Sequence, residues 1–233
     1  MKIGILEADI LDEDVQRKYG NYTDMFKELF LSVDSNLSFV SYNVVSFERP
    51  VDINECDAYL ITGSKFSAYD KDEWIYKLKD LIVELVKHQK KLIGICFGHQ
   101  IIADALGGEV KKSKKGWGVG CMLSDVKINK NGLKPIKKSF NLLVSHQDQV
   151  TKMPANAMLV AGSDFCPVSS FSISDYVLSF QGHPEFNESY LKLIMRKRRD
   201  KIGEQVYKNA IESLNNQPNS KEVAQCILNF IKL

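Results

Sequence analysis

The sequence predicts an α/β protein with three layers, in which helices cover both faces of a mostly parallel central sheet. Three short apolar segments, 2–6, 58–63 and 91–96, have the pattern of buried strands. Two segments with apolar residues at helical spacing, 23–33 and 74–86, alternate with them. Strands that alternate with helices form parallel sheets through right-handed crossovers, which is the basis of the prediction.

The remaining elements of the first half follow from local signals. Asn21 or Thr23 is the expected N-cap of the helix over 23–33, because both side chains accept hydrogen bonds from backbone amides. The segment 37–45 is rich in β-branched and aromatic residues, which favour a strand. The segment 99–108 predicts a short helix that ends at a pair of glycines.

The pattern changes after Glu109. Short β-like segments joined by turns predict antiparallel strands added to the sheet, at 118–125, 141–146, 157–163 and 177–183. Residues from Asn187 onward are predicted to be helical, with a break near 215–218. We found no repeat and no linker, so the sequence predicts one domain over 1–233, with a core over about 3–186 and C-terminal helices over 187–233.

Composition excludes several classes of protein. Hydrophobic residues make up 44% of the chain and charged residues 26%, which excludes disordered and fibrous classes. The net charge of +2 predicts no binding to nucleic acid or to an acidic membrane surface. The basic cluster 195–199 is interpreted as a solvated helix face, with a docking face for an acidic partner as the alternative. No apolar stretch is long enough to span a membrane, and the acidic start is unlike a signal peptide, so we expect a cytoplasmic protein.

The five cysteines form no C-x-x-C pair, so no metal site and no cofactor is expected, and one cysteine stands out. Cys96 lies in G-I-C-F-G-H-Q, directly after a predicted strand and before a predicted helix, which is typical of a nucleophile elbow. Gly94 and Gly98 are expected to allow a sharp turn there. The amide of Phe97 would then face a developing oxyanion, and Gly63, after the neighbouring strand, would supply a second donor.

A thiol nucleophile needs a base, and two histidines fit that role. Pro184 favours an extended chain at His183, and residues two apart in an extended chain share a face, so Glu185 can orient the His183 imidazole. His146 and Asp148 have the same spacing. The residues alone do not separate these two pairs.

These motifs resemble class I glutamine amidotransferases. G-I-C-F-G-H-Q matches the family's G-x-C-x-G-x-Q signature, and G-H-P-E matches its histidine and glutamate. A-L-G-G and S-H-x-D are also similar, and the resemblance runs from about Ile3 to Phe186. The opening Y-G-N-Y-T-D-M-F and the later I-T-G-S and S-A-Y-D resemble stand-alone relatives of the amidotransferase domain of GMP synthase, and plant γ-glutamyl peptidases.

The resemblance implies a flavodoxin-like fold and a triad of Cys96, His183 and Glu185 that hydrolyses the γ-amide of glutamine through a thioester. The amides of Gly63 and Phe97 would hold the oxyanion. The resemblance also implies substrate contacts, which it assigns to Gln100, Ser145 and His146.

The ammonia acceptor is expected on a separate synthase partner, because only about 45 residues follow the matched unit and no nucleotide-binding motif appears. The alternatives are hydrolysis of γ-glutamyl peptides, with the segment 117–120 as a border of an open site or a plain turn, and a non-catalytic regulatory role. An intact triad argues against the last.

Overall fold

A nine-stranded sheet forms the centre of the protein in the computed structural model, which describes residues 1–128, 134–136 and 138–233. Its strands lie in the order β2 (Ser38–Asn43), β1 (Lys2–Glu7), β3 (Ala58–Ile61), β4 (Lys91–Ile95), β11 (Val177–Phe180), β10 (Ser170–Ile173), β9 (Ala157–Gly162), β6 (Gly118–Val126) and β7 (Ser139–His146). The first five strands are parallel, and the pairs from β11 to β7 are antiparallel. The predicted α/β fold with a parallel sheet and antiparallel additions is therefore confirmed.

Each face of the parallel part of the sheet is covered by a pair of helices. Helices α2 (Tyr22–Leu31) and α8 (Ser220–Ile231) pack on one face, where Ile93 lies in their apolar cluster. Helices α3 (Glu73–Lys87) and α4 (Phe97–Ala105) pack on the other, where the adjacent Leu92 lies in a second cluster. Successive side chains of a strand point to opposite faces, so one apolar strand supplies both cores.

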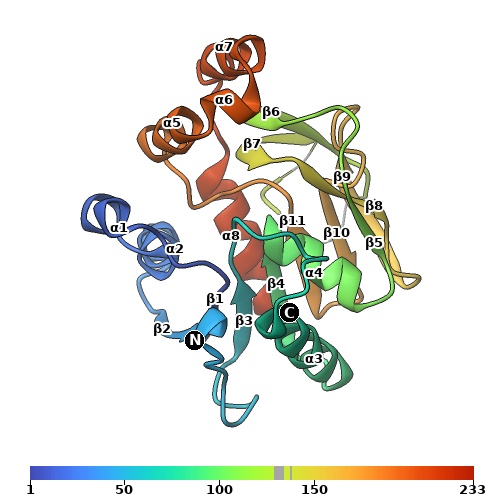
Figure 1. The fold of residues 1–233 in the computed structure, drawn as a ribbon. Helices are drawn as coiled ribbons and strands as arrows, with labels where there is room; N and C mark the ends of the chain where they lie inside the picture. Colours follow the sequence, from blue (N-terminus) through green and yellow to red (C-terminus); the bar gives the residue numbers. More distant parts are fainter. Residues whose placement is uncertain (129–133, 137) are drawn as a thin grey trace.

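A third apolar cluster joins the N-terminal and C-terminal helices at one end of the sheet. Helices α5 (Glu188–Lys197), α6 (Arg199–Ile202) and α7 (Glu204–Ser213) gather there beside β6 and β7, with α1 (Glu13–Tyr19) nearby (Figure 1). Helix α1 was not predicted, because only Val15 among its residues is buried and the segment carries no helical apolar period. A two-stranded sheet of β5 (Glu109–Lys112) and β8 (Asp148–Lys152) completes the structure.

The N-cap of α2 is Asn21, and the alternative, Thr23, lies inside the helix. The Asn21 side chain accepts a hydrogen bond from the amide of Asp24, whose carboxylate accepts one from the amide of Asn21. This reciprocal capping box satisfies two amides that the helix itself leaves without partners. No helix in the described part of the chain is long and apolar enough to cross a membrane.

Candidate active site

Cys96 occupies a strained turn between β4 and α4. Its φ of 52° and ψ of −100° lie where a residue with a Cβ is rarely found. Backbone strain of this kind persists only where the surrounding structure enforces it, and here the Cys96 amide donates to the carbonyl of Phe180 on β11. The elbow therefore presents the thiol at the carboxyl end of the parallel strands.

The two glycines that flank Cys96 serve close packing rather than the turn itself. Neither has a positive φ. A Cβ on Gly94 would lie 2.6 Å from the carbonyl oxygen of Gly98, and one on Gly98 would lie 2.3 Å from that of Ile61. The sequence led us to expect that the glycines allow the sharp turn, whereas in the structure Cys96 itself adopts the unusual backbone conformation and the glycines let α4 approach β3 and β4.

The two expected oxyanion donors, Gly63 and Phe97, are both close to Cys96 in the fold. Phe97 is the first residue of α4, where a helix leaves the amide without an intrahelical partner. Gly63 follows β3, which is parallel to β4 as expected, and a Cβ on Gly63 would lie 2.7 Å from Cε1 of His183 and 3.7 Å from Cβ of Cys96. Only glycine fits there, so the Gly63 backbone lies directly against both side chains.

Cys96, His183 and Glu185 are brought together by β4 and the segment after β11. Nδ1 of His183 lies 2.7 Å from Oε1 of Glu185, and the His183 ring and the Cys96 side chain both lie against the Gly63 backbone. The His183 ring stacks on Phe186 with centroids 3.7 Å apart, and its amide donates to the carbonyl of Leu143. These contacts fix the ring, with one nitrogen on the carboxylate and the other available to the thiol.

The electrostatics of this group favour a charged histidine. Burial alone lowers the pKa of His183, but the negative charges of Glu185 and Cys96 and the hydrogen bond to Glu185 outweigh it and raise the pKa well above 6.5. A cysteine nucleophile needs a base beside it, and the leaving group needs a proton. The arrangement can therefore supply a nucleophile and hold a proton for a leaving group.

His146 and Asp148, the alternative pair, do not form the same contact. Nδ1 of His146 lies 2.9 Å from the backbone oxygen of Asp148, while the Asp148 carboxylate accepts hydrogen bonds from Ser67 and Tyr69. Burial lowers the pKa of His146 to about 4, so its ring is neutral at physiological pH. His183 and His146 therefore differ in their hydrogen-bond partners in the folded chain, and the spacing of residues in the sequence does not reveal those partners.

Gln100 is linked to Cys96 by hydrogen bonds through Gln181, a residue that the sequence did not point to. Its amide group donates to Oε1 of Gln181 at 3.0 Å and to the backbone oxygen of Asp148 at 2.9 Å, and Nε2 of Gln181 lies 3.6 Å from Sγ of Cys96. Gln181 lies two residues before His183, so the rule that paired His183 with Glu185 also places Gln181 on that face.

The basic cluster 195–199 is only partly a solvated face. Arg198 is half-buried, donates to Oγ of Ser145 at 3.1 Å, and lies over the ring of Trp117.

Gly118 and Gly120 of the segment 117–120 belong to β6, so this segment is not a plain turn.

Two open pockets meet at Cys96. The first, of about 180 Å³, includes His183, and its walls come from residues 9–15 and α5. The second, of about 420 Å³, includes Gln100, Ser145, His146 and Trp117 but not His183. Ser64, Lys65, Ser145 and Arg198 border both. The described residues contain no group of three or more histidine, cysteine or acidic side chains arranged to hold a metal ion.

His99 points away from these pockets and packs in the core. Its ring nitrogens lie 2.8 Å from Oγ of Ser179 and 3.1 Å from the oxygen of Val168. Burial lowers its pKa to about 3.

We expect His99 to make the protein less stable in acid. Between pH 6.5 and about 3 the unfolded state binds a proton at His99 that the folded state excludes, so the free energy of unfolding falls as the pH drops, by up to about 1.4 kcal/mol per pH unit. His99→Gln should remove this contribution to the slope, measured by urea unfolding at pH 4 to 7. An unchanged slope would contradict it, and His88→Gln, at the exposed end of α3, is the control.

Comparison with known proteins identifies the family of this chain. Residues 19–197 match the model of the family described as glutamine amidotransferase class-I. The chain belongs to the class I glutamine amidotransferase family.

Relatives within this family differ in what their names say they do. γ-Glutamyl peptidase 2 of Arabidopsis thaliana is 31% identical, over 99% of this chain and 96% of its own. A glutamine-hydrolysing GMP synthase subunit of Methanosphaera stadtmanae is 33% identical over 61% of this chain and 72% of its own. A crystal structure of a glutamine amidotransferase from Thermotoga maritima has the same fold, with a TM-score of 0.73 and 19% identity over 99% of this chain and 96% of its own. The family supports a hydrolase acting on γ-glutamyl compounds.

Proposed function

We propose that this protein is a cysteine-dependent hydrolase of γ-glutamyl peptides, with Cys96 as nucleophile, His183 as acid and base, and Glu185 as the residue that orients His183. The observation that carries the proposal is the pocket beside His183, which opens directly onto Cys96. The ammonia released from glutamine, the substrate expected from the sequence, needs no such space, whereas the amino acid released from a peptide does. The γ-glutamyl peptidase relative that spans the whole chain supports the same choice.

The proposed reaction has two steps. The Cys96 thiolate attacks the γ-carbonyl carbon, the amides of Gly63 and Phe97 hold the oxyanion, and the C–N bond breaks as His183 gives its proton to the leaving amine. Water then attacks the thioester carbonyl, His183 takes a proton from it, and the C–S bond breaks to release glutamate and restore the thiolate. One water is consumed for each amide bond cleaved.

Glutamine hydrolysis with delivery of ammonia to a synthase partner is the second candidate. The likeness to the GMP synthase relative favours it, since the name of that relative makes it one part of a synthase. Gln100, Ser145 and His146 line the pocket away from His183, where either substrate would place its glutamyl group.

An assay of amine and glutamate release separates the two candidates. Purified protein is given γ-glutamyl dipeptides, glutathione and glutamine at matched concentrations. We expect kcat/KM for the best γ-glutamyl dipeptide to exceed that for glutamine at least about tenfold, because only the dipeptide fills the pocket. Preference for glutamine would overturn the peptidase proposal. Lack of turnover on all of them, with Cys96 alkylated by a glutamine-like reagent, would favour the role of ammonia supplier to a synthase.

A further inference from the structure

The side chains that line the pocket between residues 9–15 and α5 indicate which kind of leaving group it binds. We propose that it takes an α-amino acid with an apolar side chain and that Arg198 binds the carboxylate of that amino acid. This inference rests on the proposed function and names its substrate class.

The position of the pocket assigns it to the leaving group. His183 must give its proton to the departing nitrogen, so that nitrogen lies on the His183 side of Cys96. Of the two pockets at Cys96, only the first includes His183. The glutamyl part then extends into the second pocket, toward Gln100.

Much of the lining of this pocket is apolar, and the buried carboxylate of Asp9 also borders it. It is lined by side chains of the third cluster and their neighbours, namely Leu11, Val15, Tyr22, Phe186, Tyr190 and Ile194. Burial raises the pKa of both Tyr22 and Tyr190, that of Tyr190 to about 12. Both hydroxyls therefore stay neutral at physiological pH. A leucine-sized or phenylalanine-sized side chain fits this lining better than a polar one.

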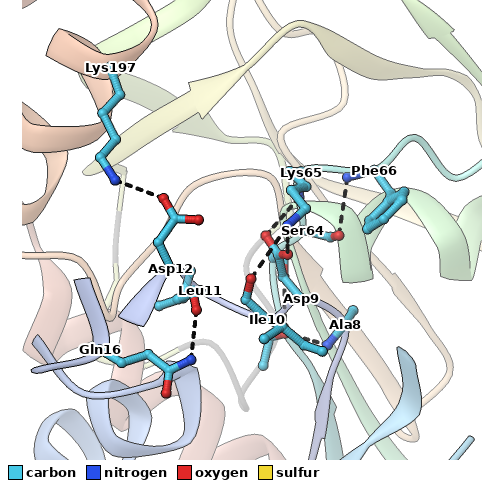
Figure 2. A network of polar contacts seen from close by, with 12 residues as sticks. Ala8, Asp9, Ile10, Leu11, Asp12, Gln16, Ser64, Lys65, Phe66 and Lys197 are labelled. Atoms are coloured by element: carbon cyan, nitrogen blue, oxygen red, sulfur yellow. Dashed lines mark hydrogen bonds and ion pairs between the residues drawn. The ribbon is translucent and has the colours of Figure 1, made fainter. Parts of the chain in front are cut away.

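Three cations lie at the rim, and two of them are already paired. Nζ of Lys65 lies 3.2 Å from Oδ1 of Asp9, and Nζ of Lys197 lies 2.8 Å from Oδ2 of Asp12. Figure 2 shows these contacts, together with the hydrogen bond from Lys65 to the oxygen of Ile10, holding the segment after β1 in place. Both acidic residues of the wall are thereby neutralised, so a positively charged leaving group finds no free carboxylate.

Arg198 is the third cation, and its guanidinium has no carboxylate within ion-pair distance in the described part of the chain. Its one hydrogen bond there is to Ser145, and Trp117 lies beneath it. A half-buried arginine without a counter-ion at the edge of a site is suited to a carboxylate, which it binds through two parallel hydrogen bonds. Arg198 lies one residue beyond the range matched by the family model, which ends at residue 197.

Two substrates that differ only in the carboxylate test this inference. They are γ-glutamyl-leucine and γ-glutamyl-3-methylbutylamide, which is the same amide without the leucine carboxylate. We expect Arg198→Gln to raise KM for γ-glutamyl-leucine about 10- to 100-fold with little change in kcat, and to leave KM for the decarboxylated amide within about twofold. Arg196→Gln, which removes an equal charge from an exposed residue of α5 outside both pockets, should change neither.

Equal losses on both substrates would overturn the inference, because Arg198 would then contact the glutamyl group. No loss on either, or no preference of the native protein for γ-glutamyl-leucine over γ-glutamyl-glycine, would also overturn it. Binding of both amides to the Cys96→Ser variant, measured by calorimetry, gives the same comparison without turnover. Failure of the proposed function is distinct: the native protein would hydrolyse no γ-glutamyl peptide, whatever residue 198 is.

Discussion

Cys96→Ala is expected to abolish hydrolysis of γ-glutamyl peptides, with a loss in kcat of at least about 10⁴-fold. The proposed mechanism passes through a thioester, and alanine provides no atom that forms one. Because alanine keeps most of the volume of cysteine, the fold should persist, although the elbow at Cys96 already has an unfavourable φ of 52°. Steady-state kinetics, with far-UV circular dichroism as the check on folding, measures both.

The matched control is Cys121→Ala. Cys121 is a buried free cysteine on β6 that lines neither pocket at Cys96, and burial raises the pKa of its thiol. This variant should keep nearly full activity. If Cys96→Ala retained a rate near that of the native protein, Cys96 would be excluded as the nucleophile.

His183→Ala is expected to reduce kcat by a similar factor, and Glu185→Gln by less, because the glutamate orients the imidazole and does not itself transfer a proton. Glutamine also removes the negative charge that raises the pKa of His183. The imidazolium then loses its proton at lower pH, so the alkaline decline in kcat/KM should shift to lower pH in Glu185→Gln. A pH–rate profile from pH 5 to 10 measures the shift.

Glu188→Gln controls for the loss of an acidic charge, since Glu188 is exposed on α5 and pairs with Lys192. Its pH profile should match that of the native protein. A loss in kcat from Glu185→Gln equal to or greater than that from His183→Ala would mean that the carboxylate does more than orient the imidazole. An unshifted alkaline limb would argue against His183 as the proton donor.

Much of the fold was predictable because its signals are local. The apolar strand before Cys96 and the helix after it are adjacent in sequence, so the elbow was recognised from seven residues. Local signals also placed the parallel strands and the helices between them. Helix α1 was missed, because only Val15 among its residues is buried, in the third apolar cluster, and the segment has no helical apolar pattern of its own.

The candidate site was likewise predictable only where its contacts are local in sequence. His183 and Glu185 are two residues apart in an extended segment, so their contact follows from backbone geometry, and the same geometry admitted His146 and Asp148. The two pairs differ because the Asp148 carboxylate accepts hydrogen bonds from Ser67 and Tyr69, which are about eighty residues away in sequence, and not from His146. Long-range contacts of this kind leave no local pattern.

The layered α/β fold, the elbow at Cys96 and the family were all evident in the amino-acid sequence, because each depends on short-range periodicity or on a contiguous motif. The folded chain was needed to show which histidine lies beside Cys96, that Gln181 reaches the Cys96 sulfur, and that Arg198, between the two pockets, has no carboxylate partner among the residues that the structure describes. Whether a charge is paired or buried depends on side chains from segments that are distant in sequence. Only the packing of the folded chain determines which of those side chains come into contact.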